Sequence, residues 1–181
     1  MTIKTAKDVL AFWFSDRMKP YWFAKSDQID TQISEEFGDT YQAAHDGQLD
    51  GWMDSSDQAL ALCIVLDQFP RNMFRGSPRS FESNDRVLGY ARMALDRGFD
   101  QEQDPKRRQF FYLPFMHSED LSDQRQSVAL YEELGNQHSL HFAREHHDIV
   151  ARFGRFPHRN AVLGRNSTPE EAEFLKTHKG F

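Results

Sequence analysis

Apolar residues recur at every third or fourth position along most of the chain, the spacing that places side chains on one face of an α-helix. The first long set with this spacing is Ile29, Ile33, Phe37, Tyr41 and Ala44. Gly47 follows this set and is predicted to end that helix. Residues 59–66 are apolar at every position. The helix predicted over residues 57–69, with Ser56 as its N-cap, should therefore lie at the centre of the fold.

Capping residues and glycines set the boundaries of the remaining helices. Further helices are predicted over residues 7–14, from Ser83 to Gly98, over residues 106–117, over residues 122–134 and from Ser139 to Phe153. The segment Thr168-Pro169-Glu170-Glu171 has the pattern of a capping box with proline at the first helical position, which predicts one more helix.

Two prolines are predicted to interrupt helices, because proline lacks a backbone donor and disfavours helical backbone at the residue before it. Pro70 should therefore stop the central helix at Phe69. Pro114 should either kink the helix over residues 106–117 or end it early.

No segment alternates apolar and polar residues for long enough to predict a β-strand. The chain is 181 residues long, a length that one domain can span, and no linker or low-complexity segment divides it. We therefore expect an all-α fold in a single helical domain over residues 1–181. It should contain seven to eight helices, antiparallel to their neighbours because the connecting loops are short.

The composition favours a soluble protein of the reducing cytoplasm. Charged residues make up 28% of the chain and the mean hydropathy is −0.73. The longest apolar stretches, residues 59–66 and 110–116, are too short to span a membrane, and the N-terminus lacks the pattern of a signal peptide. Cys63 is the only cysteine, so no disulfide forms within the chain. We expect a cytoplasmic protein with no membrane segment.

Charge is unevenly distributed along this chain of net charge −6. Residues 26–70 contain ten acids and no lysine or arginine, whereas residues 71–165 contain fourteen arginines. Two interpretations stay open: an acidic wall that faces an arginine-lined surface, or a solvated acidic face. An acidic chain without a basic stripe argues against nucleic acid as the main partner.

A short phrase occurs twice in the chain, each time after an apolar run. It is Phe69-Pro70-Arg71-Asn72 in the first copy and Phe156-Pro157-His158-Arg159-Asn160 in the second. In the first copy, Arg71 is expected either to pair with Asp67 and brace the corner, or to point into a pocket and grip a carboxylate or phosphate. Asn72 is expected to accept from backbone amides or to adopt a left-handed turn.

The second copy is rich in hydrogen-bond donors. Within nine residues the chain places Arg152, Arg155, His158, Arg159 and Asn160. No acid lies between Asp148 and Glu170, so these donors have no counter-charge nearby in the sequence. They predict an anion site, and pairing with the acids of residues 26–70 is the alternative.

A third cluster, His117-Ser118-Glu119-Asp120, follows an aromatic segment. An imidazole and two carboxylates beside apolar residues suit general acid–base chemistry or a metal. His147 and Asp148 add a pair of the kind that metal-dependent phosphohydrolases use. His146 lies on the apolar face of its helix and is expected to be a hydrogen-bonded core histidine.

These motifs, together with their neighbours, resemble a known family. The segments that carry the resemblance are Leu66–Gly76, Tyr112–Asp120, Ala151–Asn160 and Ser167–Glu171. From Val9 onward the chain is similar to the bacterial family called domain of unknown function 924. The resemblance implies an all-helical, tetratricopeptide-like array of helical hairpins, and it implies no activity.

The sequence thus predicts a helical binding protein whose concave or central pocket takes a small anionic ligand or an acidic peptide end. The residues predicted to line this pocket are Arg71, Asn72, His117, Glu119, Asp120, Arg155, His158, Arg159 and Asn160. We predict no metal and no cofactor for it. The identity of the ligand, the presence of any enzymatic activity and the oligomeric state stay open.

Two alternatives also stay open. The first is a metal-assisted hydrolase that uses His117, Asp120, His147 and Asp148. The second is an interaction scaffold without a small-molecule site, in which Asp67 and Arg71 are buried and paired with each other.

Overall fold

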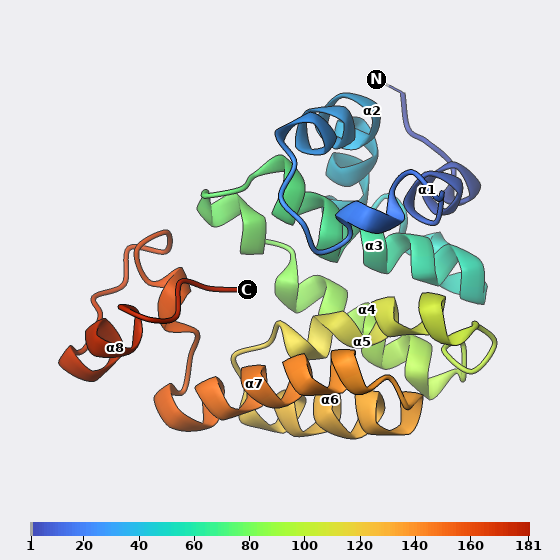
Figure 1. Cartoon of the computed structure of the whole chain (residues 1–181). Helices are drawn as coiled ribbons and strands as arrows, with labels where there is room; N and C mark the ends of the chain where they lie inside the picture. The colour runs from blue at the N-terminus through green and yellow to red at the C-terminus, as the bar shows by residue number, and fades with distance from the viewer. Residues whose placement is uncertain (1) are drawn as a thin grey trace. The chain divides into compact units, whose positions relative to one another are not determined.

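The structure is a computed structural model that describes residues 2–181. Over these residues it consists of helices and connecting loops without a β-strand, so the predicted all-α class is confirmed (Figure 1). The eight α-helices are α1 (Ala6–Trp13), α2 (Asp27–His45), α3 (Ser56–Met73), α4 (Asn84–Asp96), α5 (Pro105–Met116), α6 (Leu121–Leu134), α7 (Gln137–Phe153) and α8 (Pro169–Phe174). The four 3₁₀ helices are η1 (Lys19–Tyr21), η2 (Asp50–Asp54), η3 (Pro78–Phe81) and η4 (Pro157–Arg159).

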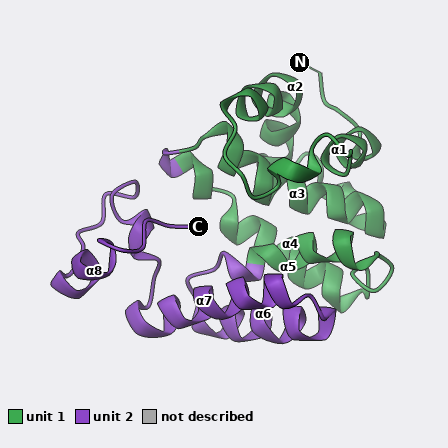
Figure 2. Cartoon of the chain, viewed as in Figure 1, with its two compact units in different colours: residues 1–75, 79–114 green, residues 76–78, 115–181 purple. Residues whose placement is uncertain are grey.

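The chain divides into two compact units (Figure 2). Unit 1 consists of the residues up to Arg75 together with residues 79–114, and unit 2 consists of residues 76–78 and 115–181. The division falls inside α5, between Pro114 and Phe115. Each unit is described separately below, and a single domain over residues 1–181 stays a prediction.

Helix α3 is the centre of unit 1, as its sequence predicts. It packs against α1, α2 and α4, and every residue from Ala59 to Leu66 is completely buried. Aromatic rings surround its C-terminal half: the ring of Phe69 lies 5.8 Å from Trp13 and 4.9 Å from Phe37, measured between centroids. This apolar burial is the main contribution to the stability of the unit.

Pro70 does not end α3, so that prediction is wrong. The helix continues through Pro70 to Met73. Because proline has no N–H, the carbonyl of Leu66 loses its usual helical partner. The hydroxyl of Ser83 supplies the missing donor and lies 2.6 Å from the Leu66 oxygen. Ser83 occupies the N-cap position of α4 but makes no side-chain capping bond there. A donor from outside the helix thus allows the proline to be tolerated.

Helix α5 also continues past its proline and ends at Met116, so the predicted early end at Pro114 is wrong, and a kink there stays a prediction. In unit 2, the side-chain amide of Gln124 closes the end of this helix. It donates to the carbonyl oxygens of Met116 at 2.7 Å and Ser118 at 2.6 Å. Gln124 is completely buried, so these bonds satisfy carbonyls that water does not reach.

The body of unit 2 is the packed pair α6 and α7. Its apolar cluster consists of Ile149, Val150 and Phe156, with Leu121, Phe153 and Phe174 packed against them. The capping box predicted before α8 is confirmed, because the Thr168 hydroxyl and the Glu171 carboxylate cap each other's backbone N–H groups. Helices α6 and α7 begin slightly earlier than predicted, after Asp120 and Asn136.

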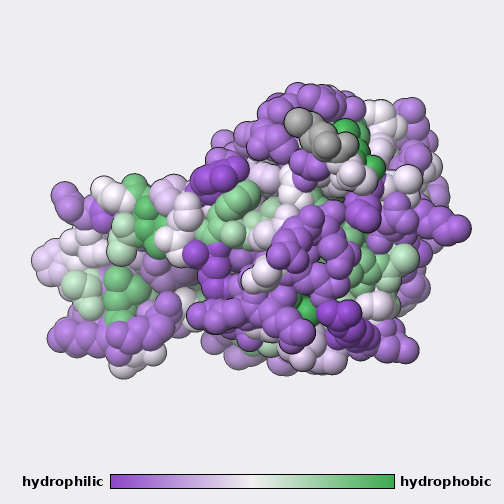
Figure 3. Space-filling view, turned by 90° about the horizontal axis from the view of Figure 1, so that it is seen from above, coloured by the Kyte–Doolittle hydropathy of each residue, from purple (hydrophilic) through white to green (hydrophobic). Residues whose placement is uncertain are grey.

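Within residues 2–181, no helix combines the length and the apolar composition that crossing a membrane requires. Figure 3 shows one face of the molecule, on which hydrophilic residues predominate and hydrophobic residues gather in small patches. The apolar positions of the helices are therefore used mainly for packing inside each unit.

Replacing Ser83 with alanine should destabilise the protein by about 1–3 kcal/mol, because the Leu66 carbonyl would be left buried without a donor. Urea denaturation measures the loss. Ser122→Ala, at an exposed serine, is the control and should change stability by less than about 0.5 kcal/mol. In a Pro70→Ala background the Leu66 carbonyl regains a helical N–H, so Ser83→Ala should cost less there. An equal cost in both backgrounds would contradict this role of Ser83.

Candidate functional site

The first copy of the repeated phrase forms a buried ion pair in unit 1. The Arg71 guanidinium lies 3.1 Å from the Asp67 carboxylate, on the same side of α3 one turn away. The Asp67 side chain is 1% exposed and that of Arg71 is 20% exposed, so the pair is largely withdrawn from water. Arg71 also donates to the Asn84 side-chain oxygen at 3.1 Å. These contacts match the bracing role that was one of the two expectations for Arg71.

Asp30 of α2 accepts hydrogen bonds from the last residue of this phrase, Asn72, and from Arg75, which follows it. The Asn72 side-chain amide donates to Asp30 at 2.8 Å. The guanidinium of Arg75 donates through Nε and Nη2 to the two carboxylate oxygens, at 2.7 and 3.0 Å. Asn72 lies within α3 and acts as a donor, so the predicted left-handed turn or backbone-accepting role is wrong. Continuation of the helix through Pro70 is the reason, because it turns Asn72 toward α2.

In unit 2 the second copy is built around Glu171, which is 2% exposed. Arg155 donates to both carboxylate oxygens, at 2.7 and 2.8 Å, and the Asn160 amide donates at 3.2 Å. The Thr168 backbone N–H adds a bond of 2.8 Å. The hydrogen bond from Arg155 is the main reason that the pKa of Glu171 falls to about 2. The sequence indicated donors without counter-charge nearby, or pairing with the acids of residues 26–70. Arg155 instead pairs with Glu171, an acid that follows the phrase in the chain.

Glu119 is the centre of a second network in unit 2. Its carboxylate accepts two bonds from Arg165, at 2.7 and 2.9 Å, and one from the Phe156 backbone N–H, at 2.8 Å. Burial raises the pKa of Glu119, but the hydrogen bonds from Arg165 and Phe156 outweigh it and hold the pKa below its usual value. Arg165 lies outside the repeated phrase, so the motifs do not indicate it.

The carboxylate of Asp120 has a structural role at the start of α6. It is the N-cap of α6 and accepts from the backbone N–H groups of Ser122 and Asp123, at 2.7 and 3.3 Å. Such a cap stabilises a helix by about 1 kcal/mol.

Three predicted residues, His117, His158 and Arg159, gather with His146 in what we call the His/Arg cluster. Arg159 is 6% exposed, and its Nη2 donates to the His117 carbonyl oxygen at 3.0 Å. The ring centroids of His117 and His146 are 6.3 Å apart. The ring of Phe156 contacts two of the histidines: its centroid lies 5.4 Å from that of His146 and 5.6 Å from that of His158.

The environment of the His/Arg cluster disfavours positive charge on its imidazoles. Burial lowers the pKa of His146 to about 3, with further lowering by the nearby His117. Burial also lowers the pKa of His158 to about 4, and the charge of Arg159 adds to the effect. The Nδ1 atom of His146 lies 2.8 Å from the Phe142 carbonyl oxygen, which agrees with the expected hydrogen-bonded core histidine.

The nine predicted residues therefore belong to several local arrangements. Arg71 and Asn72 lie in unit 1 and the other seven lie in unit 2, so a common pocket for all nine stays a prediction. Within unit 2, Glu119, Arg155 and Asn160 belong to the two carboxylate networks. His158, Arg159 and His117 belong to the His/Arg cluster.

The residues of the hydrolase alternative do not form a metal site. Among residues 2–181, no group of three or more histidine, cysteine, aspartate or glutamate side chains is arranged to hold a metal ion. His147 lies beside Asp148, with Nδ1 and the carboxylate 3.0 Å apart, and Asp120 caps α6. Residues of metal-binding type are thus present in the sequence without the geometry of a metal centre.

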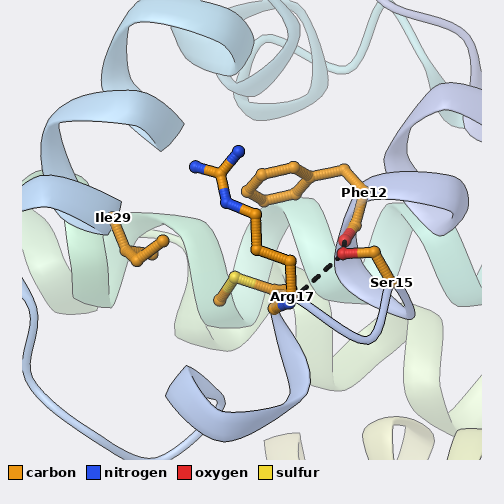
Figure 4. Close-up of a pocket in the computed structure, with 5 residues that line it drawn as sticks. Phe12, Ser15, Arg17 and Ile29 are labelled. Atoms are coloured by element: carbon orange, nitrogen blue, oxygen red, sulfur yellow. Dashed lines mark hydrogen bonds between the residues drawn. The ribbon is translucent and has the colours of Figure 1, made fainter.

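Two surface pockets are lined by none of the nine predicted residues. The larger, of about 260 Å³, is in unit 1 and is lined by Phe12, Ser15, Arg17, Met18 and Ile29. In Figure 4 the Arg17 side chain extends across this pocket, with its guanidinium beside the ring of Phe12. The smaller, of about 170 Å³, is in unit 2 and is lined by Arg125, Val128, Arg144 and His147.

The fold and these networks define an all-helical protein in which carboxylates of the chain bind Arg71, Asn72, Arg155 and Asn160 of the motifs. Residues 9–179 match the family described as "Bacterial protein of unknown function (DUF924)", so the chain belongs to this family. It is similar to the solved "Structure of Protein of Unknown Function ATU0120 from Agrobacterium tumefaciens". The two chains are 42% identical, with a TM-score of 0.92 over 96% of this chain and 97% of that one. Comparison with curated proteins gives no match.

The family resemblance carried by the motifs is thereby confirmed. Neither the family description nor the name of that solved structure states an activity. The tetratricopeptide-like arrangement of the helices stays a prediction.

Removing one partner of the Asp67–Arg71 pair should destabilise the protein by about 3–5 kcal/mol, because the other charge would stay buried alone. Asp67→Asn, Arg71→Met and the double variant form a cycle measured by urea denaturation. The double variant should cost much less than the sum of the single ones. Asp16 and Lys19, an exposed pair, give a control cycle with a coupling below about 1 kcal/mol. A similarly small coupling for Asp67 and Arg71 would contradict the bracing role.

Stability should fall as the pH drops from about 6.5 toward 4. Unfolded histidines take up protons near the ordinary pKa of 6.5, whereas folding lowers the pKa of His146 to about 3 and of His158 to about 4. The unfolded state therefore binds more protons in this range, and acid favours it. Glu171 loses its contribution only below its ordinary pKa of 4.5.

The melting temperature measured between pH 7 and 5 checks this expectation. His146→Gln and His158→Gln should each flatten the decline. His138→Gln, at an exposed histidine of α7, is the matched control and should leave the slope unchanged. A decline as steep in both cluster variants as in the natural protein would exclude these histidines as its cause.

Proposed function

We propose that the protein binds a small anionic ligand at the His/Arg cluster of unit 2. The buried guanidinium of Arg159, held among the imidazoles of His117, His146 and His158, is the observation that carries this proposal. A buried guanidinium offers several N–H donors to carboxylate or phosphate oxygens, and low surrounding polarity strengthens each bond.

The balance of charge around His158 supports an anion as the ligand. The groups whose charge acts on its imidazole are Arg159, His178 and Arg165, which disfavour the protonated form, and Glu119, which favours it. Glu119 is already engaged by Arg165 and by the Phe156 N–H. An incoming anion would add negative charge and hydrogen-bond acceptors to a region that contains two guanidinium groups.

The lowered pKa values of His146 and His158 add a second property to the proposed site. An anion placed beside these rings raises their pKa values, because it stabilises the protonated form. Binding of the anion is therefore accompanied by proton uptake near neutral and mildly acidic pH.

The networks around Asp67, Glu119 and Glu171 favour the interaction scaffold as a second candidate function. In each network a guanidinium binds a carboxylate of the same chain and so holds two segments of backbone together. A helical scaffold needs such fixed connections. The cytoplasm is kept as the proposed location because Cys63, the only cysteine, is buried in α3 and is unavailable for a disulfide. The proposed partners are the small anionic ligand or an acidic peptide end, without nucleic acid.

Titration calorimetry with inorganic phosphate and with sulfate tests the anion site. The natural protein should bind, and Arg159→Gln and His158→Gln should each lose about tenfold or more in affinity. Arg152→Gln is the matched control, since Arg152 is an exposed arginine of α7 that pairs with Glu170, and it should bind as the natural protein does.

Repeating the titration near pH 6 in two buffers of different ionisation enthalpy measures the expected proton uptake. Binding that Arg152→Gln weakens as much as Arg159→Gln would indicate unspecific attraction to positive charge. Absence of any binding by the natural protein would exclude phosphate and sulfate as ligands and leave the scaffold as the better proposal.

A further inference from the structure

We infer that the ligand of the His/Arg cluster is an aromatic oxyanion, whose ring takes the place that Phe181 occupies in this structure. This inference rests on the function proposed above and names the chemical class of the ligand and its competitor within the chain. It depends on how Phe181 is held, on the backbone of Gly180, and on two histidine nitrogens that Phe181 leaves without partners.

The ring of Phe181 lies in an aromatic surround of the kind that binds planar ligands. It stacks on His146, with the centroids 3.6 Å apart and the planes 18° from parallel. The rings of His178, His158 and Phe142 meet it nearly edge-on, at 4.9, 5.9 and 6.4 Å. One stacked face and three edge contacts are favourable geometries for an aromatic ring, so the position is selective for planar aromatic groups.

The backbone before Phe181 is fitted against the His/Arg cluster. A Cβ atom on Gly180 would lie 3.3 Å from Cδ2 and 3.4 Å from Cγ of the His158 ring. Gly180 also has a φ of +119°, a conformation that other residues rarely adopt. Glycine therefore allows the chain to approach His158 closely enough for the next residue to place its ring on His146.

The contact is of a kind that a ligand can displace. Phe181 is 54% exposed as a residue, so it is not enclosed by the groups that contact its ring. A ligand that offers the same stacking area and an additional charged group can therefore compete with it.

Two buried hydrogen-bonding atoms beside this position have no partner. Nδ1 of His158 and Nδ1 of His178 are buried and make no hydrogen bond within residues 2–181. Both of these rings contact Phe181, whose hydrocarbon ring can neither donate nor accept a conventional hydrogen bond. Buried polar atoms are nearly always satisfied, so each of these nitrogens calls for a partner that the chain does not supply. Oxygens attached to an aromatic ring at this position would provide one.

The positive charge of Arg159 specifies the remaining part of the ligand. Arg159 follows His158 directly in the chain, and its guanidinium carbon lies 4.4 Å from the centroid of the Phe156 ring. An oxyanion on the ligand would face this guanidinium, while the attached ring stacks on His146. Carboxylates and phosphates share this chemistry, and the experiment below separates them.

The experiment compares Phe181→Ala with the natural protein by calorimetric titration. The probes are phenyl phosphate, inorganic phosphate, benzoate and cyclohexanecarboxylate, so that ring and anion type vary independently. Removing the competing ring should tighten phenyl phosphate or benzoate by about three- to tenfold and leave inorganic phosphate unchanged. Cyclohexanecarboxylate, which cannot stack, should bind more weakly than benzoate in both proteins.

Two further variants make the test specific. Gly180→Ala should produce the same gain as Phe181→Ala, because the added Cβ pushes the segment away from His158. Phe23→Ala removes another exposed phenylalanine, in unit 1, and should bind every probe as the natural protein does. Preference for phenyl phosphate over benzoate would assign the anion as a phosphate, and the reverse order would assign it as a carboxylate.

The inference and the proposed function fail in different ways. Inorganic phosphate binding that depends on Arg159, without any gain from the aromatic ring or from Phe181→Ala, would overturn the inference and leave the proposed function standing. Absence of binding of every probe to every variant would overturn both.

Discussion

A carboxylate that leaves water must meet hydrogen-bond donors, and three of the carboxylates that this chain withdraws from water are bound by arginine. Asp67 and Glu171 are almost completely buried, and Glu119 is largely covered. Each is bound by a guanidinium, from Arg71, Arg155 and Arg165 respectively. An unpaired buried charge is far more costly than a paired one, so the two residues of each pair must stay in contact. Each pair therefore restricts the backbone segments that carry its two residues.

The two networks of unit 2 show what this constraint does for the fold. Glu119 lies before α6, yet its bonds to the Phe156 N–H and to Arg165 reach the segment that follows α7. Glu171 in α8 is tied back to Arg155 and Asn160 in that same segment. Phe156 packs the start of the loop between α7 and α8 into the apolar cluster, and these polar bonds determine the course of the loop beyond it. The course of this loop in turn places His158 and Arg159 beside His117 and His146.

The sequence was sufficient where the controlling interaction is local. Apolar periodicity predicts α3 and its central position, and the capping box predicts α8, because each signal lies within a few residues of the element it specifies. The pairing of Asp67 with Arg71 is one helical turn in length and was among the two expectations. The prediction failed where a distant residue changes the outcome. Ser83 supplies the donor that Pro70 removes, and nothing near Pro70 in the sequence indicates it.

The candidate site shows the same limit. The charges near the second phrase indicated an excess of donors. Arg155 and Asn160 are in fact bound by Glu171, which follows the phrase, and the Phe156 N–H is bound by Glu119, which precedes it. The His/Arg cluster contains three histidines, and their sequence positions suggested a core role for His146 alone. Their gathering depends on the loop after α7 and on the segment up to Phe181, neither of which has a periodic pattern.

The carboxylate networks and His158 differ in how far their polar atoms are hydrogen-bonded. Glu171 accepts from Arg155, Asn160 and Thr168, and such saturation leaves little for a ligand to gain. His158 is buried next to Arg159 with Nδ1 unpartnered, which lowers its affinity for protons and destabilises the folded chain in acid. By linkage, an anion that raises the pKa of this imidazole also restores the stability that the arrangement gives up. An anion bound at the proposed site would thus offset a cost that the saturated carboxylate networks do not carry.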